Sequence, residues 1–463
     1  MLKKIFSLLL LLPLCAFGQF QGDWTGDLSV QGAKLKLVFH ISLNNGQYSS
    51  TMDSPQQGAM GIPTTKTEVS NKEIIITIGS LNATYKGTLE EGEILGMFTQ
   101  NGLKIPLNLN KVEDSKEEAI IRPQDPKEPF PYQIEDFSFK NKKENIVLRG
   151  TLTLPPNCPN CPITVLHSGS GPQNRDSEIF NHRPFAVLAD ELSKNGIAVL
   201  RYDDRGVGDS EGSFSKATTE DFTADLLSAI AELKTSGKID SNLVGVIGHS
   251  EGGVVAIKAA NSLGDLAFMV LLASPGVPGG QVILKQQLDA VESSSLSDQN
   301  KKDLKKIMKE QMDILLKAKS SVERKSQLSK LYKSNFKKMP PSIKNMGLEK
   351  YTETQIKGLD SPWMEYFVKY DPRMDLAGIT IPVLALNGSL DTQVDAKQNL
   401  GSIETVLKDA GNNKVEIHEM EGLNHLFQKA ETGMVMEYGM IEETFNPDAL
   451  HLISSWINKI ILN

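Results

Sequence analysis

The sequence predicts an α/β protein in which a mostly parallel sheet, with helices on both faces and a helical cap, follows a small all-β domain. Three observations predict this fold class. Closely spaced strand patterns fill residues 20–112, strands alternate with helical patterns from about residue 132, and residues 244–260 have the pattern of a buried strand, a Gly-x-Ser-x-Gly turn and a helix. Closely spaced strands favour an antiparallel barrel or sandwich, whereas alternating strands and helices favour a parallel sheet.

Residues 1–19 have the pattern of a secretory signal peptide. Lys3 and Lys4 precede an apolar stretch, residues 5–14, which is too short to span a bilayer, and small residues follow it. We expect cleavage near Gln19 and export of the mature protein to the periplasm or the exterior. No later stretch is long and apolar enough for a membrane helix, so no transmembrane anchor is predicted.

The three cysteines bear on localisation and redox state. Lipid modification of Cys15 is the alternative to simple cleavage, although residues 12–14 match a lipoprotein sequence poorly. Cys158 and Cys161 form Cys-Pro-Asn-Cys between prolines and before a strand, whereas a thioredoxin-type site opens a helix. We therefore expect a small loop disulfide in an oxidising compartment.

Length and charge limit the classes of function. A chain of 463 residues exceeds one ordinary domain and buries a large core. A formal net charge of −8 argues against nucleic acid as the main partner.

The all-β domain is predicted at residues 20–120, with strands at 35–41 and 73–78. Its sequence shows no group of residues typical of a catalytic or ligand-binding site. Two interpretations stay open for this domain: a docking or dimerising module, or a stabilising appendage. A charged, proline-rich link at residues 113–131 separates it from the second domain, which we expect at 132–463.

In the second domain the strand and helix patterns alternate until a helical insertion interrupts them. Strands are predicted at residues 146–154, 162–167, 197–202, 268–274, 381–388 and 415–418, and helices at 185–192, 222–234 and 447–461. The insertion, about residues 279–370, has apolar residues at helical spacing and a basic stretch at 301–340. Its position indicates a cap over the site. The basic charge has two interpretations: it attracts acidic substrates or surfaces, or it belongs equally well to a solvent-exposed helix face.

The turn around Ser250 has the features of a nucleophile elbow, because a strand enters it and an alanine-rich helix leaves it. Gly248 and Gly252 lack side chains where the two backbones approach each other. Such a turn exposes the Ser250 hydroxyl above the sheet. It also directs the N–H of Glu251, at the helix start, toward a developing oxyanion.

A serine nucleophile needs a base, and the base needs an orienting acid. Asp391 and His425 each follow a predicted strand, and therefore fall at the carboxyl edge where open α/β sheets place their sites. The second oxyanion N–H is expected from Ser170, which follows Gly169 in the glycine-rich turn after residues 162–167.

Other side chains near these positions have plainer interpretations. Asp395 is expected to be a solvated charge in a helix, His418 a structural histidine within a strand, and His249 a packing residue of the elbow. Arg175 and Asp176 are interpreted as a loop salt bridge, with substrate contact as the alternative. Helix-dipole stabilisation alone explains the Glu251 side chain. His418 and His425 do not form His-Glu-x-x-His, so neither a metal nor a cofactor is implied.

The chain resembles the α/β-hydrolase superfamily in four stretches: the Gly-His-Ser-Glu-Gly-Gly elbow at 248–253, Asp-Arg-Gly-x-Gly-x-Ser at 204–210, the Asp391 segment and Gly-x-x-His at 422–425. Residues 168–176 and 361–372 are similar to exported bacterial esterases of the serine-aminopeptidase-like branch. The resemblance covers about 132–463.

The resemblance implies an α/β-hydrolase fold and a secreted carboxylesterase that cleaves short-chain esters through an acyl-enzyme. It assigns the nucleophile to Ser250, the acid to Asp391, the base to His425 and the oxyanion hole to Ser170 and Glu251. A serine aminopeptidase would use the same triad and is the main alternative. Further alternatives are a thioesterase, an acyltransferase and a non-catalytic binding protein. The expected partner is a small ester substrate, and the sequence leaves the oligomeric state open.

Overall fold

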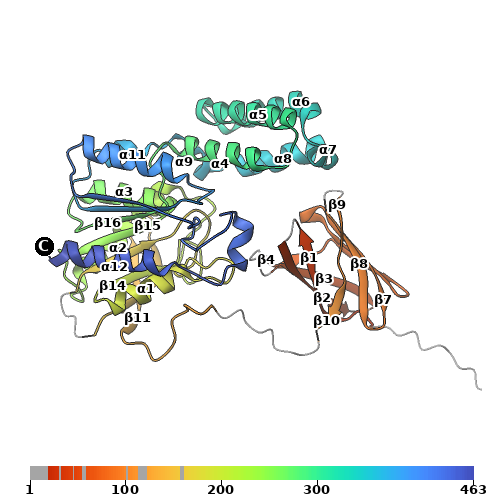
Figure 1. Ribbon diagram of the computed structural model, residues 1–463, viewed down its shortest axis with the longest axis horizontal. Helices are drawn as coiled ribbons and strands as arrows, with labels where there is room; N and C mark the ends of the chain where they lie inside the picture. Colours follow the sequence, from red (N-terminus) through yellow and green to blue (C-terminus); the bar gives the residue numbers. More distant parts are fainter. Residues whose placement is uncertain are drawn as a thin grey trace, which may run out of the picture. The chain divides into compact units, whose positions relative to one another are not determined.

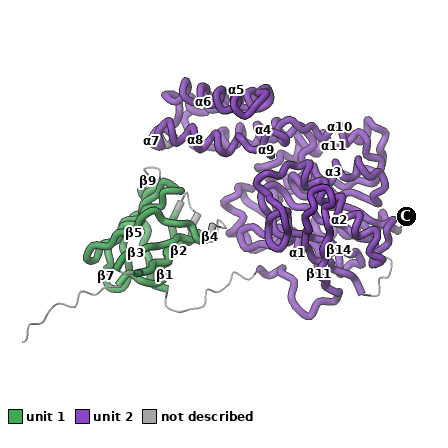
Figure 2. The backbone as a smooth tube through the Cα atoms, turned by 180° about the vertical axis from the view of Figure 1, so that it is seen from behind, with its two compact units in different colours: residues 1–55, 59–118 green, residues 56–58, 119–463 purple. Residues whose placement is uncertain are grey.

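The computed structural model describes residues 19–30, 33–44, 46–54, 59–100, 103–112, 122–156 and 161–462. They form two compact units, Met1–Pro55 with Ala59–Glu118 and Gln56–Gly58 with Ala119–Asn463 (Figure 2). The predicted signal peptide falls almost entirely outside the described residues, as do Cys15 and Cys158. Cys161 is disulfide-bonded.

The first unit is a single antiparallel sheet of ten strands within the described ranges, in the order β4-β3-β2-β1-β10-β8-β7-β6-β5, with β9 paired to β8. The strands are β1 (Gly22–Val30), β2 (Ala33–Asn44), β3 (Gln47–Ser54), β4 (Ala59–Pro63), β5 (Lys66–Ser70), β6 (Glu73–Ile78), β7 (Ala83–Glu90), β8 (Glu93–Gln100), β9 (Leu103–Pro106) and β10 (Leu109–Lys111). Inward-facing side chains such as Trp24, Phe39 and Tyr85 alternate with exposed ones and form one core.

The second unit is built on an eight-stranded sheet in the order β11-β12-β14-β13-β15-β16-β17-β18. The β11–β12 and β12–β14 pairs are antiparallel, and the others are parallel. The strands are β11 (Gln133–Asn141), β12 (Ile146–Leu154), β13 (Ile163–His167), β14 (Ala198–Tyr202), β15 (Val244–His249), β16 (Met269–Leu272), β17 (Val383–Gly388) and β18 (Val415–Met420).

Helices cover both faces of this sheet (Figure 1). One face packs on α2 (Thr219–Thr235), α3 (Glu251–Leu263) and α11 (Ala396–Asp409), and the other on α1 (Pro184–Lys194) and α12 (Pro447–Leu462). Strands buried on both sides carry continuous apolar runs, which explains why β13 to β17 were predictable from sequence.

The strand order reverses at β13, which lies between β14 and β15. Such a switch point leaves a crevice at the carboxyl ends of the neighbouring strands. The Gly169–Ser170 turn follows β13 and Ser250 follows β15, so the sheet topology brings both segments to this crevice.

The helical cap joins the sheet between β16 and β17, as the sequence predicts. It comprises α4 (Gly279–Ser293), α5 (Asp298–Lys317), α6 (Ser321–Asn335), α7 (Pro341–Met346), α8 (Leu348–Leu359) and α9 (Pro362–Lys369), and the short α10 (Pro372–Leu376) leads back to the sheet. Apolar side chains such as Leu304 and Ile307 form a separate core within the cap. In Figure 1, α5 and α6 form its outer layer, and α4 and α9 lie nearer the sheet.

Within the described ranges, the helices fall short of the combined length and hydropathy that crossing a membrane requires.

Candidate active site

Ser250 occupies a strained turn between β15 and α3. Its backbone angles are φ 56° and ψ −124°, a conformation that an L-residue rarely adopts, and its N–H donates to the Leu272 carbonyl at 2.8 Å. A Cβ at Gly248 would lie 2.1 Å from the Gly252 carbonyl oxygen, and one at Gly252 would lie 2.2 Å from the His167 oxygen. Both positions therefore require glycine, as the sequence predicts for a sharp elbow.

The structure brings His425 and Asp391 together. Nδ1 of His425 lies 2.7 Å from Oδ2 of Asp391, and both side chains are buried. The other Asp391 oxygen accepts the N–H groups of Gln393 and Val394 at 2.8 and 2.9 Å, which fixes the carboxylate plane. Because the Asp391 carboxylate accepts a hydrogen bond from the Nδ1–H group of His425, Nε2 of His425 is left as the basic nitrogen.

His249 lies against His425, with ring centroids 4.8 Å apart. Burial and the nearby His425 lower the pKa of His249 to about 3, so its ring is neutral. Its Nε2 lies 2.8 Å from the His425 carbonyl oxygen and donates to it. The expected packing residue therefore also anchors the backbone of His425, the proposed base.

The other candidate acid and base lie elsewhere. Asp395 caps α11 by accepting the Gln398 N–H at 2.7 Å and pairs with Lys285 at 3.2 Å. Asp395 is thus a partly exposed charge that precedes the helix and satisfies one of its orphan N–H groups, whereas the sequence predicted a position within the helix. His418 bonds Glu416 on β18 at 2.8 Å, in keeping with a structural role.

The backbone after β13 crosses directly over Ser250. A Cβ at Gly169 would lie 3.0 Å from Cβ and 3.5 Å from Oγ of Ser250, so glycine keeps this space open. Ser170 follows at an exposed position, and Glu251 begins α3, where the first N–H groups lack helical partners. Both residues expected to form the oxyanion hole thus adjoin Ser250.

The Glu251 side chain has a role that the sequence did not reveal. It is 2% exposed and accepts a hydrogen bond from the Thr219 hydroxyl at 2.6 Å. The indole N–H of Trp363, on the cap helix α9, donates to both carboxylate oxygens at 2.8 Å, and Ser170 supplies a further hydrogen bond. Burial raises the pKa of Glu251. Helix-dipole stabilisation alone is therefore a wrong account, because four donor contacts surround this carboxylate.

A second buried carboxyl lies beneath the oxyanion turn. Burial raises the pKa of Asp204 to about 8, although the Gln173 N–H donates to it at 3.0 Å and the Ser168 hydroxyl also contacts it. Burial acts to raise the pKa of the adjacent Asp203, but Asp203 pairs with Arg175 at 2.5 Å, and this pairing lowers its pKa overall.

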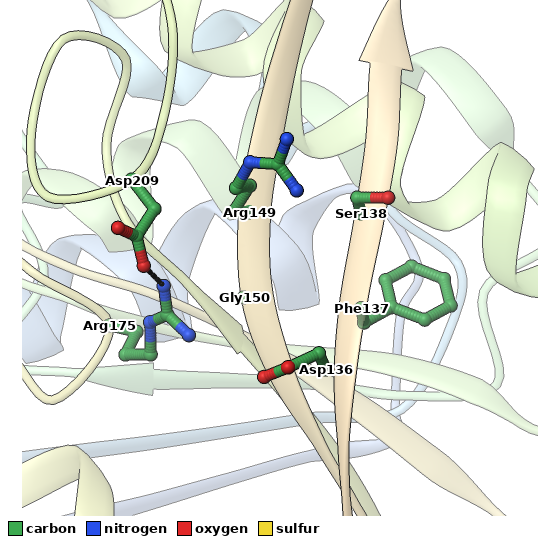
Figure 3. A pocket seen from close by; sticks show the side chains of 7 residues that line it. All are labelled: Asp136, Phe137, Ser138, Arg149, Gly150, Arg175 and Asp209. Atoms are coloured by element: carbon green, nitrogen blue, oxygen red, sulfur yellow. Dashed lines mark hydrogen bonds and ion pairs between the residues drawn. The ribbon is translucent and has the colours of Figure 1, made fainter.

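Arg175 and Asp176 do form salt bridges, though with other partners than each other. Arg175 pairs with Asp203 and, at 3.0 Å, with Asp209, whereas Asp176 pairs with Arg201. Arg175 and Asp209 also line a polar cavity of about 390 Å³ over strands β11 and β12 (Figure 3). The residues that line this cavity do not include Ser250, Asp391 or His425.

The chain is similar to proteins of known family. The serine aminopeptidase S33 family matches residues 182–330, which include Ser250 and end before Asp391. The esterase EstD of Thermotoga maritima is 26% identical over 307 residues, 65% of this chain and 64% of that protein, so the chain spans less than two thirds of this relative's length.

Two solved structures illustrate the likeness. An esterase of Pyrococcus furiosus is 16% identical, with 71% of this chain and 90% of that chain covered and a TM-score of 0.43. A proline iminopeptidase of Mycobacterium smegmatis is 14% identical, with 71% and 99% covered and a TM-score of 0.42. TM-scores this low add nothing to the assignment of the fold, which rests on the strand order, the elbow and the family match.

Proposed function

We propose that this chain, which has the α/β-hydrolase fold, is an exported serine hydrolase that cleaves short-chain carboxylic esters through an acyl-enzyme. The observation that carries the proposal is the 2.7 Å contact between His425 and Asp391 beside the strained turn of Ser250. Export rests on the signal-peptide pattern of residues 1–19.

In the first half of the reaction, Oγ of Ser250 attacks the ester carbonyl carbon while Nε2 of His425 removes the hydroxyl proton. Asp391 keeps the imidazole in the required tautomer and stabilises the imidazolium that forms. The N–H groups of Ser170 and Glu251 stabilise the oxyanion of the tetrahedral intermediate. His425 then gives its proton to the leaving alcohol.

In the second half, His425 removes a proton from water, and the resulting hydroxide attacks the acyl carbonyl. The same N–H groups stabilise the second oxyanion. Collapse of this intermediate breaks the bond to Ser250, which recovers its proton from His425, and the carboxylic acid leaves. The steps need no group beyond these side chains and water.

An ester substrate is favoured over the amino terminus of a peptide by the state of two buried carboxyl groups, those of Glu251 and Asp204. An aminopeptidase needs a carboxylate free to bind the substrate ammonium. Glu251, next to Ser250, is fully occupied by Thr219, Trp363 and Ser170. Asp204 has a raised pKa and holds its proton at neutral pH. The relative EstD is itself described as an esterase.

The test is hydrolysis of a p-nitrophenyl acyl series beside aminoacyl-p-nitroanilides by the wild type, Ser250→Ala and Ser262→Ala. Ser262 lies at the exposed end of α3, where its hydroxyl bonds the Lys258 carbonyl, so its loss leaves the elbow intact. We expect ester turnover that falls with acyl length, is absent in S250A and is retained in S262A. Faster anilide cleavage would instead identify a peptidase, and activity in S250A would overturn the assignment of the nucleophile.

A further inference from the structure

We propose that Tyr438 is a positioning residue that holds the Asp391 and His425 loops in register, and that Arg122 keeps Tyr438 in place. This inference rests on the proposed function, because it concerns the proposed acid and base. It assigns a role in catalysis to residues 122–124 of the second unit.

Tyr438 lies between the two loops. It is fully buried on the 3-10 helix η4 (Val435–Met440), and its hydroxyl accepts a hydrogen bond from Nε2 of Gln393 at 3.1 Å. The backbone N–H of the same Gln393 donates to Asp391 at 2.8 Å. The Tyr438 hydroxyl also interacts with the backbone of His425, and burial raises the pKa of the phenol, which is therefore neutral. One hydroxyl thus contacts the acid loop and the base residue.

A second hydrogen bond connects the residues just before η4 to the loop that carries Asp391. The hydroxyl of Thr392, the residue after Asp391, donates to the Gly433 carbonyl at 3.0 Å. The ring of Phe180 packs edge-on against the Tyr438 ring, with centroids 6.0 Å apart. Tyr438 therefore has little freedom to turn away from the two loops.

Arg122 fixes the backbone around Tyr438. Its guanidinium is buried and donates to the carbonyl oxygens of Ile441 at 2.7 Å and of Gly439 and Phe180 at 2.9 Å. His182 contacts the Tyr438 carbonyl at 3.0 Å. Burying a guanidinium is unfavourable unless such bonds form, so Arg122 strongly favours this one backbone arrangement.

Gln124, two residues after Arg122, makes further contacts with the chain that follows η4. The side chain of Gln124 accepts the N–H groups of Thr444 and Phe445 at 2.6 and 3.1 Å and donates to the Phe445 carbonyl at 2.7 Å. The segment after residue 121 therefore braces residues 439–445, which otherwise have little regular structure.

The test compares Tyr438→Phe with Tyr132→Phe in the full chain. Tyr132 is also buried and directly follows the link, but its hydroxyl donates to Asp190 on α1 at 2.8 Å. We expect Y438F to lower kcat roughly tenfold with KM within about twofold, because a slight displacement of catalytic groups slows chemistry more than binding. The acidic limb of its kcat–pH profile should move to lower pH, because the imidazolium loses part of its stabilisation. Y132F should keep the wild-type kcat and profile.

Two further variants keep the proposal falsifiable if Y438F folds poorly. Gln393→Ala removes the side chain that donates to the Tyr438 hydroxyl and leaves Tyr438 itself unchanged. We expect this variant to lower kcat in the same way as Y438F. Arg122→Gln should also lower kcat, and the R122Q/Y438F pair should be little slower than its slower single variant, because both disrupt one arrangement.

The outcomes separate this inference from the proposed function. Wild-type kcat and pH profile in both Y438F and Q393A would overturn the role of Tyr438, while ester turnover lost only in S250A would leave the proposed function standing. If the fold-reductions in kcat of R122Q and Y438F multiplied in full in the double variant, the role of Arg122 would be overturned. An inactive wild type would remove the proposed function itself.

Discussion

The indole N–H of Trp363 lies 2.8 Å from each carboxylate oxygen of Glu251, so the cap helix α9 is bonded to the residue that follows the nucleophile. Tyr366, one turn further along α9, donates to Glu220 on α2 at 2.9 Å. These bonds attach α9 to the catalytic unit at two places. The inner cap helix α9 is therefore a fixed wall of the site, and through Val368 it also shares the apolar core of the cap with the outer helices α5 and α6.

Trp363→Phe tests this attachment. The variant keeps an aromatic ring but removes a donor from a buried carboxylate, so we expect the free energy of unfolding to fall by about 1–3 kcal/mol. Trp456→Phe is the matched control, because Trp456 packs edge-on against Phe268 on the opposite face. Urea unfolding measures the stability, and ester kinetics should show lower kcat/KM for W363F alone. Equal kcat/KM in W363F and the wild type would contradict the fixed wall.

Asp204 predicts a pH-dependent stability. Its carboxyl keeps its proton to about pH 8 when folded but releases it near pH 4 when unfolded. Between these values the folded state binds more protons, so stability falls as pH rises, by up to about 1.4 kcal/mol per pH unit. Asp204→Asn removes this dependence, and its unfolding free energy should gain on the wild type from pH 5 to pH 8. A constant difference across this range would refute the raised pKa.

Asp203→Asn should behave in the opposite way. The Arg175 partner lowers the pKa of Asp203, so the ionised carboxyl stabilises the folded state above its unfolded pKa, and this contribution disappears as pH falls through the folded value. D203N should therefore be less stable than the wild type at pH 7 and approach it in acid. The two neighbouring aspartates give opposite trends in the same unfolding experiment.

Gly169→Ala tests the space over Ser250. The added methyl would lie 3.5 Å from the nucleophilic oxygen, where the ester carbonyl must approach, so we expect kcat/KM to fall about a hundredfold. Gly171→Ala is the comparison, because Gly171 has φ 94° and an added Cβ would meet only Nε2 of Gln173, at an ordinary contact distance of 3.9 Å. G171A should cost about 1 kcal/mol of stability through backbone strain. If G169A kept normal kcat/KM, the substrate would not approach from this side.

Much of the fold and of the site was predictable because the relevant signals are local. Apolar runs marked β13 and β15, and the glycines around Ser250 follow from the close approach of a strand and a helix. The fixed order of the sheet then placed Asp391 and His425 at one edge. In contrast, the bonds of Glu251 to Trp363 and of Arg122 to Ile441 join residues 112 and 319 positions apart. No periodicity or spacing encodes such pairs.

The variants Asp391→Asn and Asp395→Ala show which of the two aspartates is the catalytic acid. D391N gives the imidazole the wrong tautomer, and we expect kcat to fall on the order of 10⁴-fold with little change in KM. D395A removes the helix cap of α11 and should lower stability by about 1 kcal/mol while kcat stays near the wild-type value. The reverse pattern would make Asp395 the catalytic acid.

The most direct test of the central claim is mass spectrometry of peptides after reaction with an alkyl fluorophosphonate. We predict one adduct per chain on Ser250, formed as fast as ester turnover is lost. The adduct should be absent in S250A and should form much more slowly in His425→Ala. An adduct on another residue, or full ester turnover in a chain modified at Ser250, would contradict the account.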